Sequence, residues 1–171
     1  MLIVLRLGHR RGRDARLSTH CGLAARALGA DRIIFSGEED TQLLESIKKV
    51  TKKWGGPFKV EYNPNWRKLI KQHKKKKFSI AHLTMYGLPL AKQIRKIRKS
   101  RNVLLVIGSE KVPGEVYQLA DYNIAVTSQP HSEAAALGVF LHEYFRGREK
   151  KFKKANISVI PQAKGKKVIE K

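Results

Sequence analysis

The sequence has little cysteine and no long apolar run. Its one cysteine, Cys21, excludes a disulfide framework within the chain, and Cys-x-x-Cys metal pairs are absent. No apolar run approaches the roughly 20 residues that a membrane-spanning helix needs, and no signal-type segment follows a charged start. We therefore expect a cytoplasmic protein with no membrane role and no required metal. Cys21 falls on the apolar face of a predicted helix and is interpreted as a small core residue rather than a nucleophile.

Several catalytic and phosphate-binding motifs are also missing. Neither G-x-G-x-x-G nor G-x-x-x-x-G-K-[ST] occurs, so the loops that cradle the phosphates of dinucleotides and triphosphates are absent. G-x-S-x-G and H-E-x-x-H are absent too, and Ser132 beside His131 has no third partner placed by the sequence. A hydrolase is disfavoured, whereas a ligand that carries adenine without phosphate stays open.

Acidic residues are scarce relative to basic ones. The chain has 14 Asp and Glu against 36 Lys and Arg, a formal net charge of +22. The excess is spread over segments 6–16, 67–77, 92–101 and 146–154 rather than confined to a tail. Because such an imbalance repels itself unless a polyanion is bound, nucleic acid is the partner that the charge favours. The alternative is a lysine-rich surface that serves only solubility.

The periodicity predicts one α/β domain. With 171 residues and 42% hydrophobic content, the chain suffices for one compact domain and not comfortably for two. Strands are predicted over 2–7, 32–35, 58–62, 78–84, 103–107 and 121–126, and helices over 17–28, 39–53, 65–74, 88–99 and 132–145. This alternation is typical of a three-layer α/β/α fold with a mostly parallel sheet.

The most informative stretch follows the last two predicted strands. The strand over 103–107 runs into GSEKVPGEV, and the strand over 121–126 runs into TSQPHSEAAALGVFLHEYF. Ligands in open parallel sheets bind outside the carboxyl ends of strands, so these two loops predict a small-molecule pocket. Main-chain groups of 108–112 and 126–133 are suited to a neutral base. An ordinary strand-turn-helix crossover is the alternative.

The last predicted helix is apolar on every side. Residues 134–141 read AAALGVFL, whereas a surface helix has one apolar stripe. We expect burial on two sides, by the sheet on one and by a second copy of the chain on the other. Coverage by the C-terminal segment is the alternative.

These motifs resemble a known family. GSEKVPG followed by IAVTSQPHSEAAALGVFLHEYF is similar to the paired C-terminal motifs of the SPOUT class of RNA methyltransferases. The opening RLGHRRGRDARLSTHCGLAARALGADRIIF resembles the N-terminal motif of the archaeal tRNA (cytidine(56)-2'-O)-methyltransferases, which modify a ribose in the TΨC loop. The resemblance spans 2–147. It implies a deep trefoil knot in the C-terminal part, an S-adenosylmethionine pocket and an obligate homodimer.

The resemblance also implies the cofactor-binding residues. They are Leu83, Gly108, Ser109, Glu110, Lys111, Val112, Val126, Thr127, Ser128, Gln129, Pro130, His131, Ser132 and Glu133. Each has an ordinary structural alternative: Leu83 as a core residue, Ser132 as a helix N-cap, and Glu133 as a first-turn partner of the helix dipole.

The first motif supplies the residues expected to act on RNA. By resemblance an arginine acts on the 2'-hydroxyl, and Arg16 is our choice, with Asp14 orienting it or capping the helix. Because a guanidinium stays charged, Arg16 is expected to grip the phosphate and stabilise developing alkoxide charge. His20 is the alternative proton acceptor, or else a packing residue. RNA binding is assigned to Arg10, Arg11 and Arg13.

We therefore expect S-adenosylmethionine-dependent 2'-O-methylation of a tRNA ribose, cytidine 56 by resemblance. The alternative function is a non-catalytic basic RNA-binding protein such as a ribosomal component. The expected methyltransferase domain is 1–147, and 148–171 is a basic extension packed on or flanking it. Its apolar cluster 157–160 is expected to add a strand or pack on the core, with the surrounding lysines suited to RNA phosphates.

Overall fold

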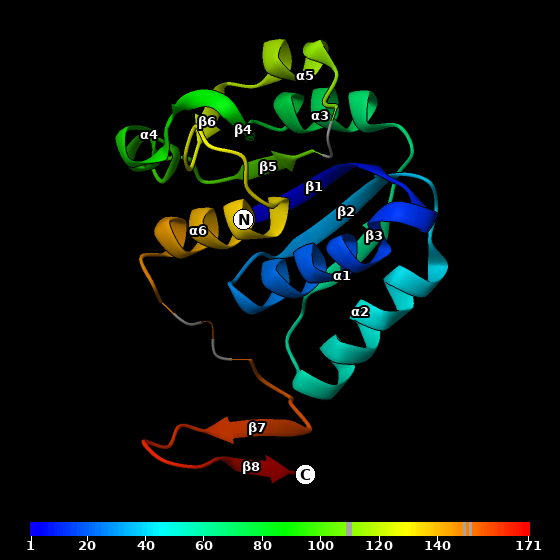
Figure 1. Ribbon diagram of the computed structural model, residues 1–171, viewed down its shortest axis with the longest axis vertical. Helices are drawn as coiled ribbons and strands as arrows, with labels where there is room; N and C mark the ends of the chain where they lie inside the picture. The colour runs from blue at the N-terminus through cyan, green and yellow to red at the C-terminus, as the bar shows by residue number, and fades with distance from the viewer. Residues whose placement is uncertain (109–110, 149, 151) are drawn as a thin grey trace.

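A six-stranded parallel sheet forms the centre of the molecule (Figure 1). The computed structural model describes residues 1–108, 111–148, 150 and 152–171. The strand order is β3-β2-β1-β5-β4-β6, and all five pairings are parallel. The strands are β1 (Leu2–His9), β2 (Arg32–Gly37), β3 (Lys59–Tyr62), β4 (Ser79–Pro89), β5 (Val103–Ile107) and β6 (Tyr122–Ala125).

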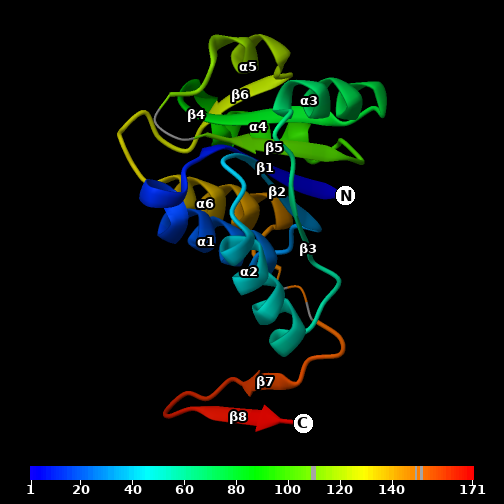
Figure 2. The same cartoon turned by 90° about the vertical axis from the view of Figure 1, so that its right-hand side faces the viewer.

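Helices cover both faces of this sheet (Figure 2). One hydrophobic core holds residues from α1 (Arg11–Ala27), α2 (Thr41–Trp54), α4 (Leu90–Ile97) and α6 (Glu133–Phe145). The second core holds residues from α3 (Trp66–Lys75) and α5 (Gly114–Leu119). The expected three layers and mostly parallel sheet are confirmed.

The apolar runs of the central strands account for this arrangement. In β1, Leu2 and Val4 face the first core, whereas Ile3, Leu5 and Leu7 face the second. Side chains alternate between the two faces of a strand, so a continuous apolar run is buried only where both faces are covered. Strand β5 is likewise buried along its whole length. The central strands therefore require helices on both sides.

The structure differs most from the sequence prediction at α1, β4 and α5. Helix α1 begins at Arg11 rather than at residue 17, which places Arg16 inside the helix and not beside its start. The extra turns are stabilised by Asp14, whose carboxylate accepts hydrogen bonds from the main-chain N–H of Arg10 at 3.2 Å and from its Nε at 3.0 Å. Strand β4 continues to Pro89, and the short helix α5 replaces part of a predicted turn.

Helix α6 is buried on one side only within a single chain. Ala136, Leu137, Phe140 and Leu141 are buried, but Val139 is 44% exposed. Ala135 is exposed as well, beside Val139 on the next turn. One side of α6 is therefore buried as expected, whereas the side assigned to a second copy is open in the single chain, and the described C-terminal residues do not cover it.

The C-terminal residues form a separate hairpin. The apolar cluster 157–160, expected either to add a strand or to pack on the core, forms β7 (Ile157–Ile160), which pairs with β8 (Lys167–Glu170) as an antiparallel ribbon and not with the main sheet. The hairpin lies beyond the α1–α2 side of the sheet (Figure 1). The preceding segment is anchored by Phe152, whose ring lies 4.5 Å from the guanidinium of Arg26. Along the described part of the chain, no helix has the length and apolar character needed to cross a membrane.

Candidate active site

A cavity of about 450 Å³ lies at the carboxyl ends of β5 and β6, beside the middle of β4. Its walls come from residues 82–86 of β4, the loops that follow β5 and β6, helix α5, and the facing sides of α1 and α6. Because β4, β5 and β6 are parallel neighbours, their carboxyl ends meet at one edge of the sheet. The predicted pocket position is confirmed.

Many of the residues chosen from the sequence line this cavity. They are Leu83, Gly108, Val112, Val126, Gln129, Pro130, His131, Ser132 and Glu133. Lys111, Thr127 and Ser128 are exposed and do not line it. Ser109 and Glu110 lie outside the described residues. The cavity thus gathers two loops that are separated in the sequence by the α5–β6 unit.

Other lining residues were missed by sequence reasoning. They are Leu17, His82, Thr84, Met85, Tyr86, Ile107, Tyr117 and Ala136. Most lie on elements whose apolar pattern indicates only core packing, so the sequence offers no sign that one end of each element is open to a cavity. His82 is the exception, because a histidine in the middle of an apolar strand is a detectable signal.

His82 forms the polar floor of the cavity. Its side chain is fully buried, its Nδ1 lies 2.9 Å from Oδ1 of Asn123, and its ring contacts Tyr117 edge-on at 4.7 Å between centroids. Burial lowers the pKa of His82, although the Asn123 hydrogen bond opposes the shift. The Tyr117 hydroxyl in turn lies 3.0 Å from Oγ1 of Thr84. His82 is therefore a neutral, fixed wall residue.

The loops close tightly over the strand ends. A Cβ on Gly108 would lie 2.0 Å from Cγ2 of Val112, so a larger residue at position 108 would force the Val112 side chain to move. Ser132 is the N-cap of α6, and its Oγ accepts a hydrogen bond from the N–H of Ala135 at 3.1 Å. The Ser132 hydroxyl is therefore engaged in capping, which further disfavours a hydrolase.

A buried charge network lies beneath the cavity, between the first turns of α1 and α6. Arg6 of β1 is fully buried, and its Nε lies 3.1 Å from Oε2 of Glu133. Asp14 is also buried and pairs with Arg10. Although burial opposes ionisation of Asp14, the Arg10 hydrogen bond and the nearby Arg6 charge lower its pKa. For Glu133, burial raises the pKa despite the charge of Arg6.

The proposed RNA-acting residues lie outside the cavity of their own chain. Arg16 and His20 are exposed on α1 and do not line the cavity. Arg11 binds the acidic loop after β2, where its N–H donates to Oε2 of Glu38 at 2.8 Å. Arg13 is exposed, whereas Arg10 is half-buried against Asp14. The first motif therefore presents its cations to solvent around the start of α1.

A Ser–His–Asp constellation that the sequence did not indicate joins three elements. His9 Nδ1 lies 2.7 Å from Oγ of Ser18, and His9 Nε2 lies 3.2 Å from Oδ2 of Asp40. Ser18 and His9 are almost fully buried, so a substrate cannot reach them. Asp40 also caps α2 through the N–H of Leu43. The constellation therefore links β1, α1 and α2.

Within the described ranges, no three His, Cys, Asp or Glu side chains converge to hold a metal ion.

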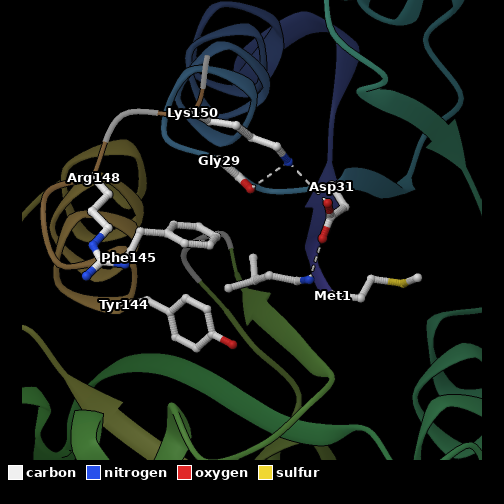
Figure 3. A pocket seen from close by; sticks show the side chains of 8 residues that line it. Met1, Gly29, Asp31, Tyr144, Phe145, Arg148 and Lys150 are labelled. Carbon is white, nitrogen blue, oxygen red and sulfur yellow. Dashed lines mark hydrogen bonds and ion pairs between the residues drawn. The ribbon is translucent and has the colours of Figure 1, made fainter. Parts of the chain in front are cut away.

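A second cavity, of about 320 Å³, lies at the start of β1, beside Met1 and Leu2 (Figure 3). The rings of Tyr144 and Phe145 lie on one side of it, across from Asp31 and Lys150. The Asp31 carboxylate is already satisfied, because it accepts from the N–H of Leu2 at 2.8 Å and from Nζ of Lys150 at 3.2 Å. The contacts beside this cavity therefore attach the C-terminal segment, through Lys150 and Asp31, to the start of β1.

Solved structures share this architecture. A TrmH/SpoU tRNA modifying enzyme from A. aeolicus superposes with a TM-score of 0.64 at 20% sequence identity, over 86% of this chain and 75% of that one. The SpoU methyltransferase AviRb from Streptomyces viridochromogenes, in complex with the cofactor AdoMet, gives 0.60 at 16% identity, over 85% and 57%. At these identities the likeness establishes the fold alone.

Sequence relatives establish the family. The family profile described as tRNA ribose 2'-O-methyltransferase, aTrm56, matches residues 54–169. The tRNA (cytidine(56)-2'-O)-methyltransferase of Pyrococcus horikoshii is 51% identical over 176 residues, which cover 99% of this chain and 85% of the relative. With the cavity at the strand ends and the SpoU-type fold, these matches show that the chain belongs to the aTrm56 family of tRNA ribose 2'-O-methyltransferases.

Proposed function

We propose that this chain transfers the methyl group of S-adenosylmethionine to the 2'-hydroxyl of cytidine 56 in tRNA. The observation that carries the proposal is the match over 99% of the chain to a relative of that activity, together with a cavity built from both predicted loops. The net charge of +22 suits a polyanionic substrate. We expect the reaction to take place in the cytoplasm.

The cavity suits the adenosine part of the cofactor. Leu83, Ile107 and Val126 give it apolar walls, and about 450 Å³ lies within the range of small-molecule sites. Gly108 and the loop at 126–133 place main-chain groups at its rim, where they would hold a neutral base by hydrogen bonds. When bound, the cofactor supplies an electrophilic methyl group on a sulfonium. The chain's task is to orient that methyl towards the ribose oxygen and to exclude water.

Arg16 is the residue that we assign to the ribose. The ribose oxygen gains the methyl as the sulfur–carbon bond breaks, and its proton leaves to solvent or to His20. A guanidinium beside the oxygen and its phosphate stabilises the negative charge that develops. Because Arg16 is exposed and outside its own cavity, we assign it to the cavity of a second copy of the chain.

The exposed side of α6 supports the homodimer. Val139 is 44% exposed and Leu28 at the end of α1 is 36% exposed. Leu28 lies against α6 at the neighbouring residue, because a Cβ on Gly138 would be 3.8 Å from Cδ1 of Leu28. An apolar patch at the contact of two helices is better covered by a second copy than by water. Leu137 and Leu141 of the same helix are fully buried core residues, so their substitution would report on folding rather than on the interface.

We also infer a trefoil knot around β4 and β6. Strand β4 pairs with β6 twice, with a register shift between Leu83 and Leu88. Gly87 lies so close to β6 that a Cβ there would be 2.4 Å from the main-chain N of Ile124. The support for this inference is the renewed pairing of β4 with β6 after the register shift, together with the family resemblance.

Nucleoside analysis of a tRNA transcript tests the function. After incubation with chain and cofactor, alkaline hydrolysis should leave a 2'-O-methylated dinucleotide that begins with cytidine 56, because the methyl blocks cleavage of the 3'-phosphodiester. A matched transcript with uridine at this position should lose the product if the base is recognised. Methyl groups found only on base atoms would contradict the proposal, and so would the absence of cofactor binding, which the non-catalytic RNA-binding alternative predicts.

A further inference from the structure

The charged side chain of the cavity lining is an acid, although the chain as a whole is strongly basic. Basic residues outnumber acidic ones 36 to 14 over the sequence. Yet among the described residues that line the cavity, Glu133 is the only Asp, Glu, Lys or Arg. An acid in the ligand cavity of a strongly basic protein favours a ligand that carries a positive charge next to that acid.

Glu133 also forms an ion pair with Arg6 on its buried side. Its Oε2 is buried against the Nε of Arg6 at 3.1 Å, while 18% of its side chain is still exposed and borders the cavity. Arg6 is fully buried, and none of its side-chain nitrogens has a hydrogen-bond acceptor among the described residues, so its contact with Glu133 is an ion pair. The buried positive charge of Arg6 holds the carboxylate of Glu133 beside the cavity.

The cavity lining combines two kinds of residue. Leu83, Ile107 and Val126 are apolar and suit an adenine ring. Glu133 is the first residue of α6 and supplies a carboxylate, near the contact of α1 and α6. A ligand that joins an aromatic base to a cation matches both kinds of residue.

We propose that Glu133, positioned by Arg6, recognises the positive charge of the methyl donor and makes the cavity prefer the sulfonium over the neutral thioether left after transfer. The inference rests on the proposed function and deepens it. Transfer removes the cation, so the same carboxylate that holds the donor loses its hold on the product. The charge of Glu133 thus favours donor binding before the reaction and product release after it.

The titratable and charged groups near Glu133 are Arg6 from β1, Arg10 just before α1, Asp14 and Cys21 from α1, and His131 from the loop before α6. Burial raises the pKa of Glu133 and of Cys21, the latter to about 12, so Cys21 stays a neutral thiol. Arg6 opposes the shift in Glu133. A bound cation on the cavity side would further favour the carboxylate.

Calorimetric titration of two ligands tests the proposal. S-adenosylmethionine and S-adenosylhomocysteine share the adenosine and the amino-acid group and differ in the methyl and its positive charge. Glu133→Gln should weaken S-adenosylmethionine binding by on the order of tenfold, with S-adenosylhomocysteine changed by less than about twofold. Glu143→Gln on the same helix is the matched control, because it makes the same charge change on a side chain that is 51% exposed. This control should bind both ligands like the wild type.

Three outcomes overturn the proposal. Equal loss for both ligands would assign Glu133 to the shared amino-acid group, and unchanged donor binding would remove it from recognition. Failure of the wild-type chain to bind S-adenosylmethionine at all would contradict the proposed function itself. Since Glu133→Gln leaves Arg6 buried without a counter-charge, the double variant Arg6→Leu/Glu133→Gln repeats the test in a chain without that defect. It should show the same loss of donor preference.

Discussion

The Arg6–Glu133 pair makes an asymmetric double-mutant cycle. Arg6 has no exposed surface, so Glu133→Leu strands a buried cation that cannot reach water, and we expect a loss of about 3–5 kcal/mol in the free energy of unfolding. Arg6→Leu leaves the carboxyl group of Glu133 without its partner cation. This group is 18% exposed and burial already raises its pKa, so it can either contact water or bind a proton. That loss should be smaller, on the order of 1–3 kcal/mol.

The double variant decides between a coupled pair and two independent packing residues. Arg6→Leu/Glu133→Leu removes both charges and leaves apolar side chains, so it should cost less than Glu133→Leu alone. Urea unfolding followed by tryptophan fluorescence, at one fixed protein concentration, gives the four free energies. The exposed pair Glu45–Lys48 serves as the control and should show far weaker coupling. Additive single effects at Arg6 and Glu133 would refute the reasoning.

Four further results are expected. Arg16→Ala should lower methyl transfer by on the order of a hundredfold or more while S-adenosylmethionine affinity, measured by calorimetry, stays near that of the wild type; normal turnover would remove Arg16 from the mechanism. Val139→Lys should shift sedimentation equilibrium from twice the 19.4 kDa chain mass towards one, whereas Val159→Lys, also at an exposed valine, should not. The affinity for S-adenosylmethionine should fall as the pH drops through the raised pKa of Glu133, because the protonated acid no longer attracts the cation, and S-adenosylhomocysteine should show no such fall. The N–H of Leu43, followed by His9, lowers the pKa of Asp40, so its contribution to stability is present above the unfolded value of about 3.9 and is lost as the pH falls through the folded value; Asp40→Asn should flatten this part of the unfolding profile.

The elements of the sheet followed from local pattern. The runs at 103–107 and 2–7 are apolar at every position or nearly so, and only a strand with two covered faces buries such a run. The loops after 107 and 126 were therefore correctly placed at one edge of the sheet, since parallel strands point their carboxyl ends the same way. The start of α1 was predicted too late in the chain, because a segment with four arginines and no apolar periodicity is typical of a loop. The ion pair between Arg10 and Asp14, which stabilises the first turn, is visible only in the structure.

Composition, periodicity and motif spacing by themselves determined the fold class, the edge of the sheet that carries the cavity, and most of the loop residues that line it. They did so because burial and strand direction depend on neighbouring residues along the chain. Only the tertiary structure decided that Arg6 lies under Glu133, that His82 forms a wall, that Arg16 faces away from its own cavity and that one side of α6 is uncovered. Those facts depend on contacts between residues such as 6 and 133, which no local pattern relates, and it is such contacts that set charge and orientation at the site.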